Sequence, residues 1–536
     1  MRKIILGLKN SNAECREGIS NNIVEMYVDV LTLPMTHLIN QIFEKADFPC
    51  IWKLYKTIGI YKGKDEREEL SSYRPISILS PLSKVVEKVI LIQLYEHMSN
   101  NGLFNNRGYA YKDSISTINA LIDIHETWCD NIDSNYQNIN MFLDMSAAFD
   151  CVPRSTLIEK MRIYKFGEQT IDLISSYLSH RSQYVSINGQ DSEIRWMKFG
   201  VPQGSNLGPF LFNLYTQELT SVLNDECSHS TEINSVLHND DLFDNYCDVC
   251  GVMITFADDA SLLLRTRRGE CHITSNKLDS LLIKLKLFLR SNNLKLNIDK
   301  TQLIRVTPRQ QLVANQGEKI LLEARDKDDN RISPKTTAKI LGLTVSNNLL
   351  WSNHLEKGKE AIIPKCKKML GALKFAAGGS SFSVKKRLAE AIIMSRIVYG
   401  IQLWGSGSAK SVIRRVQSVQ NLAMCWVTSS HRLTSTKTLL GRLNWLSVNQ
   451  LIYYHGFLLL YKVMAKKVPK MNHNQLLRGS QKMGRMDLTK KRWSNNIQNI
   501  FNTVSPEIRN EVKISVFKRR IKSWIRVNID VFGSTD

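Results

Sequence analysis

The chain has 536 residues, of which 43% are hydrophobic and 23% charged, so it can bury hydrophobic cores and is not disordered overall. Its net charge of +22 favours a polyanionic partner. Residues 351–536 hold 33 Lys and Arg against 8 Asp and Glu, whereas residues 1–350 hold 39 against 42. The pattern predicts a nearly neutral body followed by a basic, nucleic-acid-binding region; a lysine-rich solvated surface is the alternative.

Cysteine usage and hydropathy indicate the compartment. The ten cysteines show no regular spacing, which is typical of proteins in a reducing environment. The first seven residues turn polar too early for a signal peptide, and no apolar run approaches the roughly 18 residues that span a bilayer. We expect a soluble intracellular protein of the nucleus or cytoplasm, with no membrane partner.

The first 180 residues alternate predicted helices with two predicted strands. Helices are expected over 1–50, interrupted by Pro34 and Pro49, and over 81–98, 114–129 and 153–180. Strands are expected over 52–62 and 140–144, the second ending on Asp144. Lys62 and Arg74 lie on either side of an acidic turn at 65–69. Two cations that met there would suit a triphosphate, although solvated surface positions are the alternative.

A predicted hairpin and a glycine-rich loop follow. Strands at 183–188 and 194–199 flank Asn188-Gly189, a strong hairpin signal. The loop 200–209 then opens an apolar helix over 210–223, which places free N–H groups beside the amide of Gln203. Residues 225–250 hold seven acids and no Lys or Arg, which indicates an inserted acidic loop. A zinc site is the alternative there, and its ligands would be Cys227, His229, Cys247 and Cys250.

Asp258 and Asp259 lie within the apolar run 251–264, where a tight turn between two strands would hold both carboxylates at a hairpin tip. A helix is expected over 276–289, a strand and turn over 294–301, and a further strand over 339–345. Basic helices are expected over 351–430, with a break at 378–381, and over 431–536. Three tryptophans of the last region would stack on bases or belong to a helical core: Trp445, Trp493 and Trp524.

Asp144, Asp258 and Asp259 all lie on apolar strands and could converge if those strands are adjacent. Clustered carboxylates repel one another unless cations neutralise them, and all-oxygen ligands select hard ions such as Mg²⁺ or Mn²⁺. Two such ions suit in-line phosphoryl transfer. The sequence therefore predicts a two-metal centre for phosphoryl transfer in a protein that holds nucleic acid by charge.

The order of these motifs resembles that of reverse transcriptases from non-LTR retrotransposons of the jockey-like, endonuclease-bearing class. The matching stretches are Tyr73-Arg74-Pro75-Ile76-Ser77, Phe142-Leu143-Asp144 through Phe149-Asp150, Gly200 to Pro209, Phe256-Ala257-Asp258-Asp259, Leu296-Asn297 with Lys300-Thr301, and Leu341-Gly342. Together they cover about residues 15–350, and we expect no endonuclease domain in this chain.

The resemblance implies an α+β fold, a right-hand polymerase with fingers, a ferredoxin-like palm and a helical thumb. Fingers would occupy 1–125, the palm 126–345 with the acidic insertion 225–250, the thumb 346–430, and a basic helical nucleic-acid-binding domain 431–536. The implied activity is RNA-directed DNA polymerisation in retrotransposition, with an RNA template, a DNA primer or target and deoxynucleoside triphosphates as partners. The resemblance does not imply any particular oligomeric state.

The resemblance also implies roles for individual residues. Asp144 and Asp258 would be the principal metal ligands, Asp259 would support them, and Lys300 would protonate the departing pyrophosphate. A second group would bind substrates: Lys62 and Arg74 would hold the triphosphate, Phe149 would exclude a ribose 2′-hydroxyl, and Gln203 and Gly204 would contact the template–nucleotide pair. Leu341 and Gly342 would lie in the primer grip.

Some residues depart from the family pattern. The run from Gly108 to Ser114 carries Lys112 where the family usually has Arg, which keeps the charge but loses the bidentate fork. Gly59 stands where Pro is usual. The altered run from Gly108 to Ser114 favours one alternative, a catalytically silent nucleic-acid-binding relic. The lack of a recognisable endonuclease favours another, an intron-type maturase.

Overall fold

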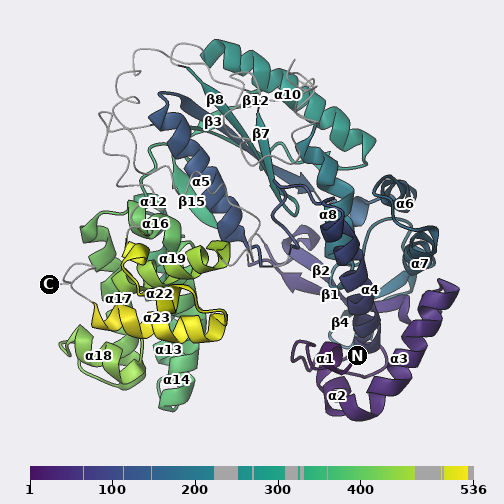
Figure 1. The fold of residues 1–536 in the computed structure, drawn as a ribbon, viewed down its shortest axis with the longest axis horizontal. Coiled ribbons are helices and arrows are strands. Elements are labelled where there is room, and N and C mark those ends of the chain that lie inside the picture. The colour runs from purple at the N-terminus through teal and green to yellow at the C-terminus, as the bar shows by residue number, and fades with distance from the viewer. Residues whose placement is uncertain are drawn as a thin grey trace.

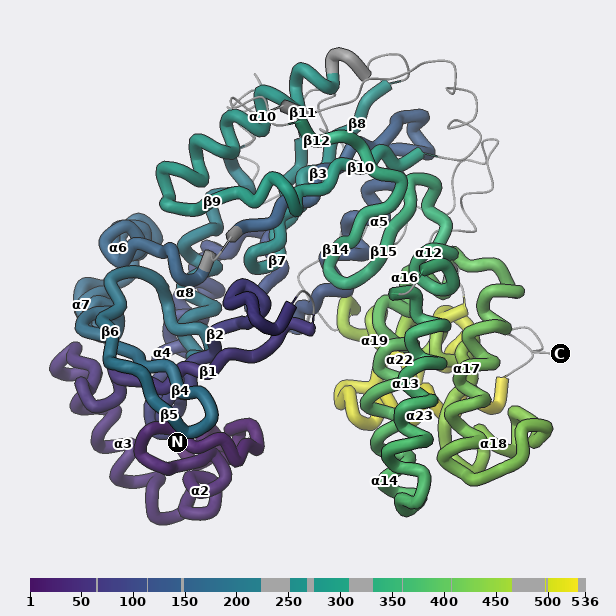
Figure 2. The backbone as a smooth tube through the Cα atoms, turned by 180° about the vertical axis from the view of Figure 1, so that it is seen from behind, coloured from purple at the N-terminus to yellow at the C-terminus, as the bar shows by residue number. Residues whose placement is uncertain are grey.

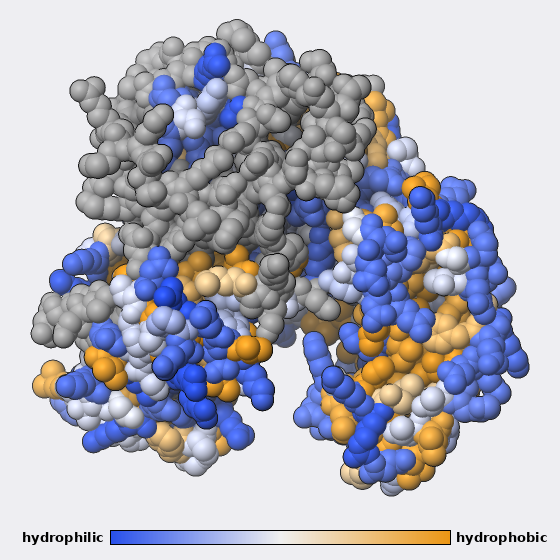
Figure 3. Space-filling model, in the orientation of Figure 1, coloured by the Kyte–Doolittle hydropathy of each residue, from blue (hydrophilic) through white to orange (hydrophobic). Residues whose placement is uncertain are grey.

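The computed structural model describes residues 1–63, 66–112, 114–146, 148–222, 251–267, 271–307, 324–325, 331–358, 360–464, 497 and 500–528. Its elements form three parts, shown from two sides in Figures 1 and 2. An N-terminal lobe contains a small sheet, a second sheet lies in the middle, and the helices after residue 351 form a helical lobe. The two lobes stand apart at the lower edge of Figure 3.

The sheet of the N-terminal lobe has the strand order β2-β1-β4-β5, and β6 also pairs with β4. Strand β1 (Leu54–Tyr61) runs antiparallel to β2 (Tyr73–Ile78) and parallel to β4 (Ser182–Ile187). The short strands β5 (Gln190–Asp191) and β6 (Arg195–Trp196) fold back on β4. The surrounding helices are α1 (Arg2–Ile5), α2 (Asn21–Met26), α3 (Val28–Lys45), α4 (Pro81–Asn100), α6 (Arg154–Ile163) and α7 (Glu168–Leu178).

The central sheet has the order β13-β10-β3-β8-β7, and β9 also pairs with β3. Strand β3 pairs antiparallel with both β8 and β10, so it lies inside the sheet. The strands are β3 (Gln137–Ser146), β7 (Val252–Phe256), β8 (Asp259–Thr266), β9 (Lys295–Leu296), β10 (Gln302–Val306) and β13 (Pro334–Lys335). A two-stranded sheet of β11 (Ala324–Arg325) and β12 (Arg331–Ile332) is separate.

Side chains of β3 alternate between two hydrophobic cores, as the period of two of a strand requires. Met141 and its odd-numbered neighbours share a core with α8 (Gly208–Thr216) and α10 (Cys271–Ser291). Phe142 belongs to the core that contains α5 (Thr117–Asp133). On that face Trp128 Nε1 donates to Asn140 Oδ1 at 2.9 Å, which gives the buried amide oxygen a partner. Asp144 has the same parity as Phe142 and therefore belongs to the α5 face.

The helical lobe follows a hairpin of β14 (Thr337–Ile340) and β15 (Leu343–Ser346). One continuous core includes Leu370, Val416, Trp445 and Phe517, so helices before and after residue 430 share it. The helices are α12 (Ser352–Leu355), α13 (Ile362–Ala377), α14 (Phe382–Leu388), α15 (Ser395–Val398), α16 (Ile401–Gly407), α17 (Lys410–Thr428), α18 (Thr436–Leu443), α19 (Val448–Met464), α22 (Pro506–Arg509) and α23 (Ile514–Val527).

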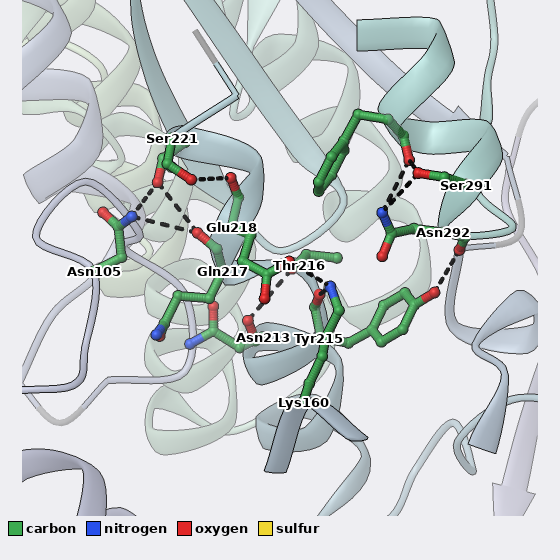
Figure 4. A network of polar contacts seen from close by, with 12 residues as sticks. Asn105, Lys160, Asn213, Tyr215, Thr216, Gln217, Glu218, Ser221, Ser291 and Asn292 are labelled. Atoms are coloured by element: carbon green, nitrogen blue, oxygen red, sulfur yellow. Dashed lines mark hydrogen bonds and ion pairs between the residues drawn. The ribbon is translucent and has the colours of Figure 1, made fainter. Parts of the chain in front are cut away.

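A polar network fixes α8 and the 3₁₀ turn after it against its neighbours (Figure 4). Lys160 of α6 is buried; its Nζ donates to the Tyr215 carbonyl at 2.7 Å and lies 3.0 Å from Glu218 Oε2. Tyr215 Oη donates to the carbonyl of Asn292, which follows α10, at 2.5 Å. Three helices that are distant in sequence are therefore tied together beneath the central sheet.

Most predicted elements are confirmed, including the break at 378–381 and the hairpin at Asn188-Gly189, where both residues have positive φ. Three predictions are wrong. Pro34 lies inside α3, because one missing backbone N–H does not outweigh the rest of a packed helix. Residues 339–345 form a hairpin rather than one strand. The helix after the glycine-rich loop begins at Gly208 and ends at Thr216, with a 3₁₀ turn at 217–220.

Two further sequence expectations can be checked. Trp445 is buried in the helical core, where its Nε1 donates to Glu390 at 2.8 Å. Trp524 packs against the same core. Trp493 lies outside the described residues. Within the described part of the chain, none of the helices has the length and apolar character required to cross a bilayer.

His354 leads to a prediction about pH and stability. Its Nδ1 accepts a hydrogen bond from the Thr344 amide at 3.3 Å, and its Nε2 is buried without a partner. Burial, and then Lys339, lower its pKa to about 4. The unfolded chain binds a proton near pH 6.5 and the folded one does not, so the histidine's contribution to stability is full above 6.5 and falls by about 3 kcal/mol as the pH decreases to 4.

Urea unfolding of the wild type and of His354→Gln at several pH values measures this effect. The difference in unfolding free energy between the two proteins should shift in favour of the variant as the pH falls from 7 to 4. A difference that stays constant across that range would contradict the assignment.

Candidate active site

The register of the central sheet brings the predicted carboxylates together. Strands β3 and β8 pair so that Asp144 lies directly opposite Asp259. Side chains directly opposite each other in an antiparallel pair have Cβ atoms about 4.5–5.5 Å apart. Asp258 is the preceding residue, in the turn between β7 and β8. Residues more than a hundred positions apart are therefore neighbours at one end of one sheet.

The turn that holds Asp258 is short and is secured from outside. Phe256 pairs with Asp259 across the hairpin, and Ala257 between them has a φ of 57°. The free edge of β7 is covered by the segment 107–109, because Tyr109 N donates to the Thr255 carbonyl at 2.9 Å and Thr255 N donates to the Arg107 carbonyl at 3.0 Å. The hairpin tip is thus fixed on both sides.

The proximity of the carboxylates raises their pKa values. Burial, then Asp258, then Asp144, raise the pKa of Asp259 to about 6. Burial and then Asp144 raise the pKa of Asp258, whereas Arg74 lowers it. Both aspartates are exposed residues, so the site is open to solvent. A site of this kind favours a cation.

The fit of a divalent cation follows from the donor set. Three carboxylates form a donor set of oxygen atoms alone, which selects hard ions such as Mg²⁺. Among the described residues, no three His, Cys, Asp or Glu side chains are close enough together to hold a metal ion as they stand. The carboxylates are therefore adjacent and of the right chemistry, and their side chains would have to turn toward a shared ion.

Two cationic residues lie beside the carboxylates. Lys300, in the turn between β9 and β10, places its Nζ 3.5 Å from Asp144 Oδ2. Arg74 of β2 is exposed and close enough to Asp258 to lower its pKa. Lys62 follows β1, and its Nζ donates to the Ser71 carbonyl at 2.6 Å. Since Ile60 pairs with Arg74, Lys62 and Arg74 lie near one end of the same strand pair, as the sequence predicts.

The glycine-rich loop packs between the two sheets. Ser77 N of β2 donates to the Gln203 carbonyl at 2.8 Å, and Gln203 Nε2 donates to Asp150 Oδ2 at 3.3 Å. Gly204 has a φ of +116°, and a Cβ there would lie 2.5 Å from the Ser77 carbonyl oxygen. The ring of Phe149 stacks on Phe212 of α8 at 4.3 Å, which holds it rigidly beside the loop.

The pair Leu341 and Gly342 forms the tip of the β14–β15 hairpin, and both residues have positive φ. The tip is held by a residue that sequence reasoning missed. Tyr399, between α15 and α16, donates its hydroxyl to the Leu341 carbonyl and lies 3.3 Å from Thr117 Oγ1. Its ring would be 3.2 Å from a Cβ at Gly342. An isolated tyrosine among helices carries no signal of this contact in the sequence.

In the atypical segment after Gly108, the side chain of Lys112 points into the protein. Lys112 Nζ donates to the Asn105 carbonyl and lies 5.4 Å from the centre of the Phe104 ring. Burial lowers the pKa of Lys112 to about 8. Tyr111, with a φ of 55°, has its pKa raised to about 12 by burial and then by Asp258, so it lies near the carboxylates. The predicted acidic insertion 225–250 and its four candidate zinc ligands lie outside the described residues.

Comparison with known proteins agrees with this geometry. Residues 60–345, more than half of the chain, match the model of the family "Reverse transcriptase (RNA-dependent DNA polymerase)". The chain therefore belongs to the reverse transcriptase family, whose fold is a right-hand polymerase of mixed α/β content.

Its similar proteins include polymerases of mobile elements. The chain is 27% identical over 425 residues to the "Probable RNA-directed DNA polymerase from transposon BS" of Drosophila melanogaster, which covers 78% of this chain and 43% of that protein. It is 23% identical over 420 residues to the "RNA-directed DNA polymerase from mobile element jockey" of the same species, and this match covers 78% of this chain and 42% of that protein. The chain thus spans less than half the length of these relatives. An apo telomerase structure from Candida tropicalis matches with a TM-score of 0.41 and 11% identity, over 89% of this chain and 69% of that one.

The close approach at Gly204 gives a prediction. Gly204→Ala combines a positive φ with a contact to backbone, so the loop must move away from β2; we expect the free energy of unfolding to fall by about 1–3 kcal/mol. Gly371→Ala in α13 is the matched control, because nothing lies within 4 Å of its Cβ position and alanine favours a helix. Equal unfolding free energies of the two variants, measured in urea, would contradict the prediction.

Proposed function

We propose that the chain is an RNA-directed DNA polymerase that extends a primer 3′-hydroxyl on an RNA template during retrotransposition. The observation that carries the proposal is the register that sets Asp144 opposite Asp259, with Asp258 beside them. The primer 3′-hydroxyl would lose its proton to solvent water as its oxygen bonds to the α-phosphorus of a deoxynucleoside triphosphate. The bond to the β-phosphate oxygen would break, and pyrophosphate would leave.

The carboxylates would serve as metal ligands. Asp144 and Asp258 would hold two Mg²⁺ ions, or Mn²⁺, with Asp259 in support. When bound, such ions supply positive charge that stabilises the attacking and leaving oxygens. Lys300 lies 3.5 Å from Asp144, from where its ammonium group would transfer a proton to the departing pyrophosphate.

The remaining residues would bind and select the substrate. Lys62 and Arg74 would hold the triphosphate, because Arg74 is close enough to Asp258 to lower its pKa. Phe149 would exclude a ribose 2′-hydroxyl, since its stacking on Phe212 leaves the ring no room to retreat. Gln203 and Gly204 would contact the template–nucleotide pair from the loop bonded to β2.

The parts of the right hand would follow the sequence. We assign 1–125 to the fingers, 126–345 to a ferredoxin-like palm, 346–430 to the thumb and 431–536 to a basic nucleic-acid-binding region. The shared core of the last two parts supports their acting as one body. The excess of Lys and Arg after residue 350 supports contact with the phosphates of RNA and DNA.

Primer extension with the purified chain, an RNA template and Mg²⁺ tests the proposal. Asp144→Asn and Asp258→Asn should each reduce nucleotide incorporation by about a hundredfold or more, because each removes charge from the reacting centre. Asp191→Asn, in the exposed β5, changes the same charge and should extend normally. Full extension by the Asp258→Asn protein would refute its assignment as a ligand.

The same assay separates the polymerase from a silent nucleic-acid-binding relic. Lys112 favours that second reading, because its ammonium group bonds an internal carbonyl and is not directed at a template. Salt-sensitive RNA binding without incorporation by the wild type would establish the relic and reject the polymerase.

Tyr399 provides a separate prediction about primer positioning. Tyr399→Phe keeps the ring against Gly342 but removes the hydrogen bond to the Leu341 carbonyl. We expect the KM for the primer–template to rise about fivefold, the value of one neutral hydrogen bond, with kcat and the unfolding temperature nearly unchanged. Tyr27→Phe, at an exposed site, is the control. An equal fall in kcat for every primer length would count against a positioning role.

A further inference from the structure

A pocket lies between the N-terminal lobe and the glycine-rich loop, and of its lining residues the function proposed above uses Gln203 alone. Its walls come from β1, β2, the start of α6, Arg181 and the loop 199–203. Figure 2 shows these strands side by side, with the β4–β5–β6 hairpin next to them. The cavity volume is about 90 Å³, and the pocket is open to solvent.

Two arginines line this pocket with unused donors. Arg181 is 1% exposed; its Nη1 donates to the Tyr177 carbonyl at 3.0 Å, while its Nε and Nη2 are buried without a partner. Arg154 donates through Nη2 to the Met197 carbonyl at 2.5 Å, and its Nε is also buried and unpartnered. Buried guanidinium donors that lack acceptors are costly, so these three N–H groups indicate an external acceptor.

The charges around the pocket favour an anion. Burial, and then Arg181, lower the pKa of Arg154, which shows that two like charges are close together. Burial raises the pKa of Glu87, and Arg181 is close enough to lower it. The Glu87 carboxylate accepts from Ser83 Oγ and Asn206 N, and no ion pair among the described residues joins it to Arg181. Asp150 is the one acidic residue of the pocket lining, and it accepts from Gln203.

The face of the sheet distinguishes this pocket from the triphosphate site. Successive side chains of a strand point to opposite faces. Pro75 and Ser77 of β2 line the pocket, so Arg74 belongs to the other face. Tyr55 lines the pocket as well and pairs with Gln183, another lining residue. An anion held by Arg154 and Arg181 is therefore separate from phosphates held by Arg74.

An aromatic at the rim indicates that the anion belongs to a nucleic acid strand. Phe199 lines the pocket and is 54% exposed, and Trp196 of the adjoining hairpin is 67% exposed. Exposed aromatics beside a cationic site are typical of single-strand binding, in which bases stack while phosphates are neutralised. Free phosphate has no base to stack.

We propose that Arg154 and Arg181 form a site for a phosphodiester of the single-stranded template that has not yet been copied, with Phe199 stacking on an adjacent base. The proposal rests on the proposed polymerase function, because it assigns the loop's Gln203 to the neighbouring template–nucleotide pair. Template leaving that pair would pass over the opposite face of β2 from the incoming triphosphate.

Binding of the full chain to two labelled substrates tests the site without nucleotides. One is a blunt RNA–DNA duplex, and the other is the same duplex with a six-nucleotide 5′ RNA overhang. The wild type should bind the overhang substrate more tightly. Arg154→Ala should remove about tenfold of that gain and reduce the slope of log affinity against log salt by about one, with blunt-duplex affinity unchanged.

Three further variants serve as controls and as independent tests of the site. Arg162→Ala lies on the same helix α6, pairs with Glu168 and does not line the pocket, so it should keep the whole gain. Phe199→Ala should lose part of the gain without any change in salt slope. Arg181→Lys keeps the charge but not the fork and should lose part of the gain; if it fails to fold, Arg154→Ala decides.

Several outcomes would overturn the site. If Arg154→Ala keeps the full affinity gain from the overhang, the arginines have a structural role and do not bind the template. An unchanged gain together with a raised KM for the deoxynucleotide would assign the pocket to the triphosphate instead. Failure of the polymerase is distinguishable, because a wild type that incorporates nothing can still show an overhang gain that Arg154→Ala abolishes.

Discussion

The antiparallel pairing of β3 with β8 is the constraint on which the rest of the structure depends. It places Asp144 opposite Asp259 and keeps Asp258 one residue away, so three like charges meet at a sheet end. Cross-strand pairs of like charge are destabilising, and buried backbone bonds along eight residue pairs hold the strands in this register in spite of them. Burial first, and then the charges of Asp258 and Asp144, raise the pKa of Asp259 to about 6. A site that is destabilised in this way is poised to bind a cation.

The support for that register comes from both faces of the sheet. Because side chains alternate, Met141 binds β3 to the α8–α10 side, while Phe142 and Asn140 bind it to α5. A slip of one residue would exchange these sets between the two cores, where neither would fit its new neighbours. The network around Lys160 and Tyr215 fixes the helices beneath. Precision at the carboxylates is therefore a consequence of packing far from them.

The two other functional surfaces are set by contacts between distant segments. The loop at Gly204 can approach β2 only because no Cβ intervenes, and the tip at Gly342 is held by Tyr399 from the helical lobe. The first contact joins the loop to the N-terminal lobe, and the second joins the β14–β15 hairpin to the helical lobe. Motion of either lobe would displace the loop or the tip, which is where template and primer are proposed to lie.

The sequence by itself determined the order of the elements and most of the chemistry. Period-two and helical patterns identified β1, β3, the Asp258-Asp259 hairpin and the long helices, because burial of apolar residues is local in its periodicity. The order of motifs predicted the family that the comparison with residues 60–345 then established. The residue types at 144, 258 and 259 indicated hard-cation chemistry before any neighbour was known.

Tertiary structure decided what periodicity cannot. A helical stripe does not reveal whether it is covered: Met26 and Val30 follow the spacing of a buried face, yet are 75% and 71% exposed. Hairpin 339–345 looked like one strand, because a positive φ at Leu341 leaves no local mark. The guanidinium of Arg181 lies over the ring of Tyr55, which is 126 positions earlier in the sequence, and only the tertiary structure reveals this contact. Local patterns specify which elements form, whereas partners across the fold specify which side chains meet.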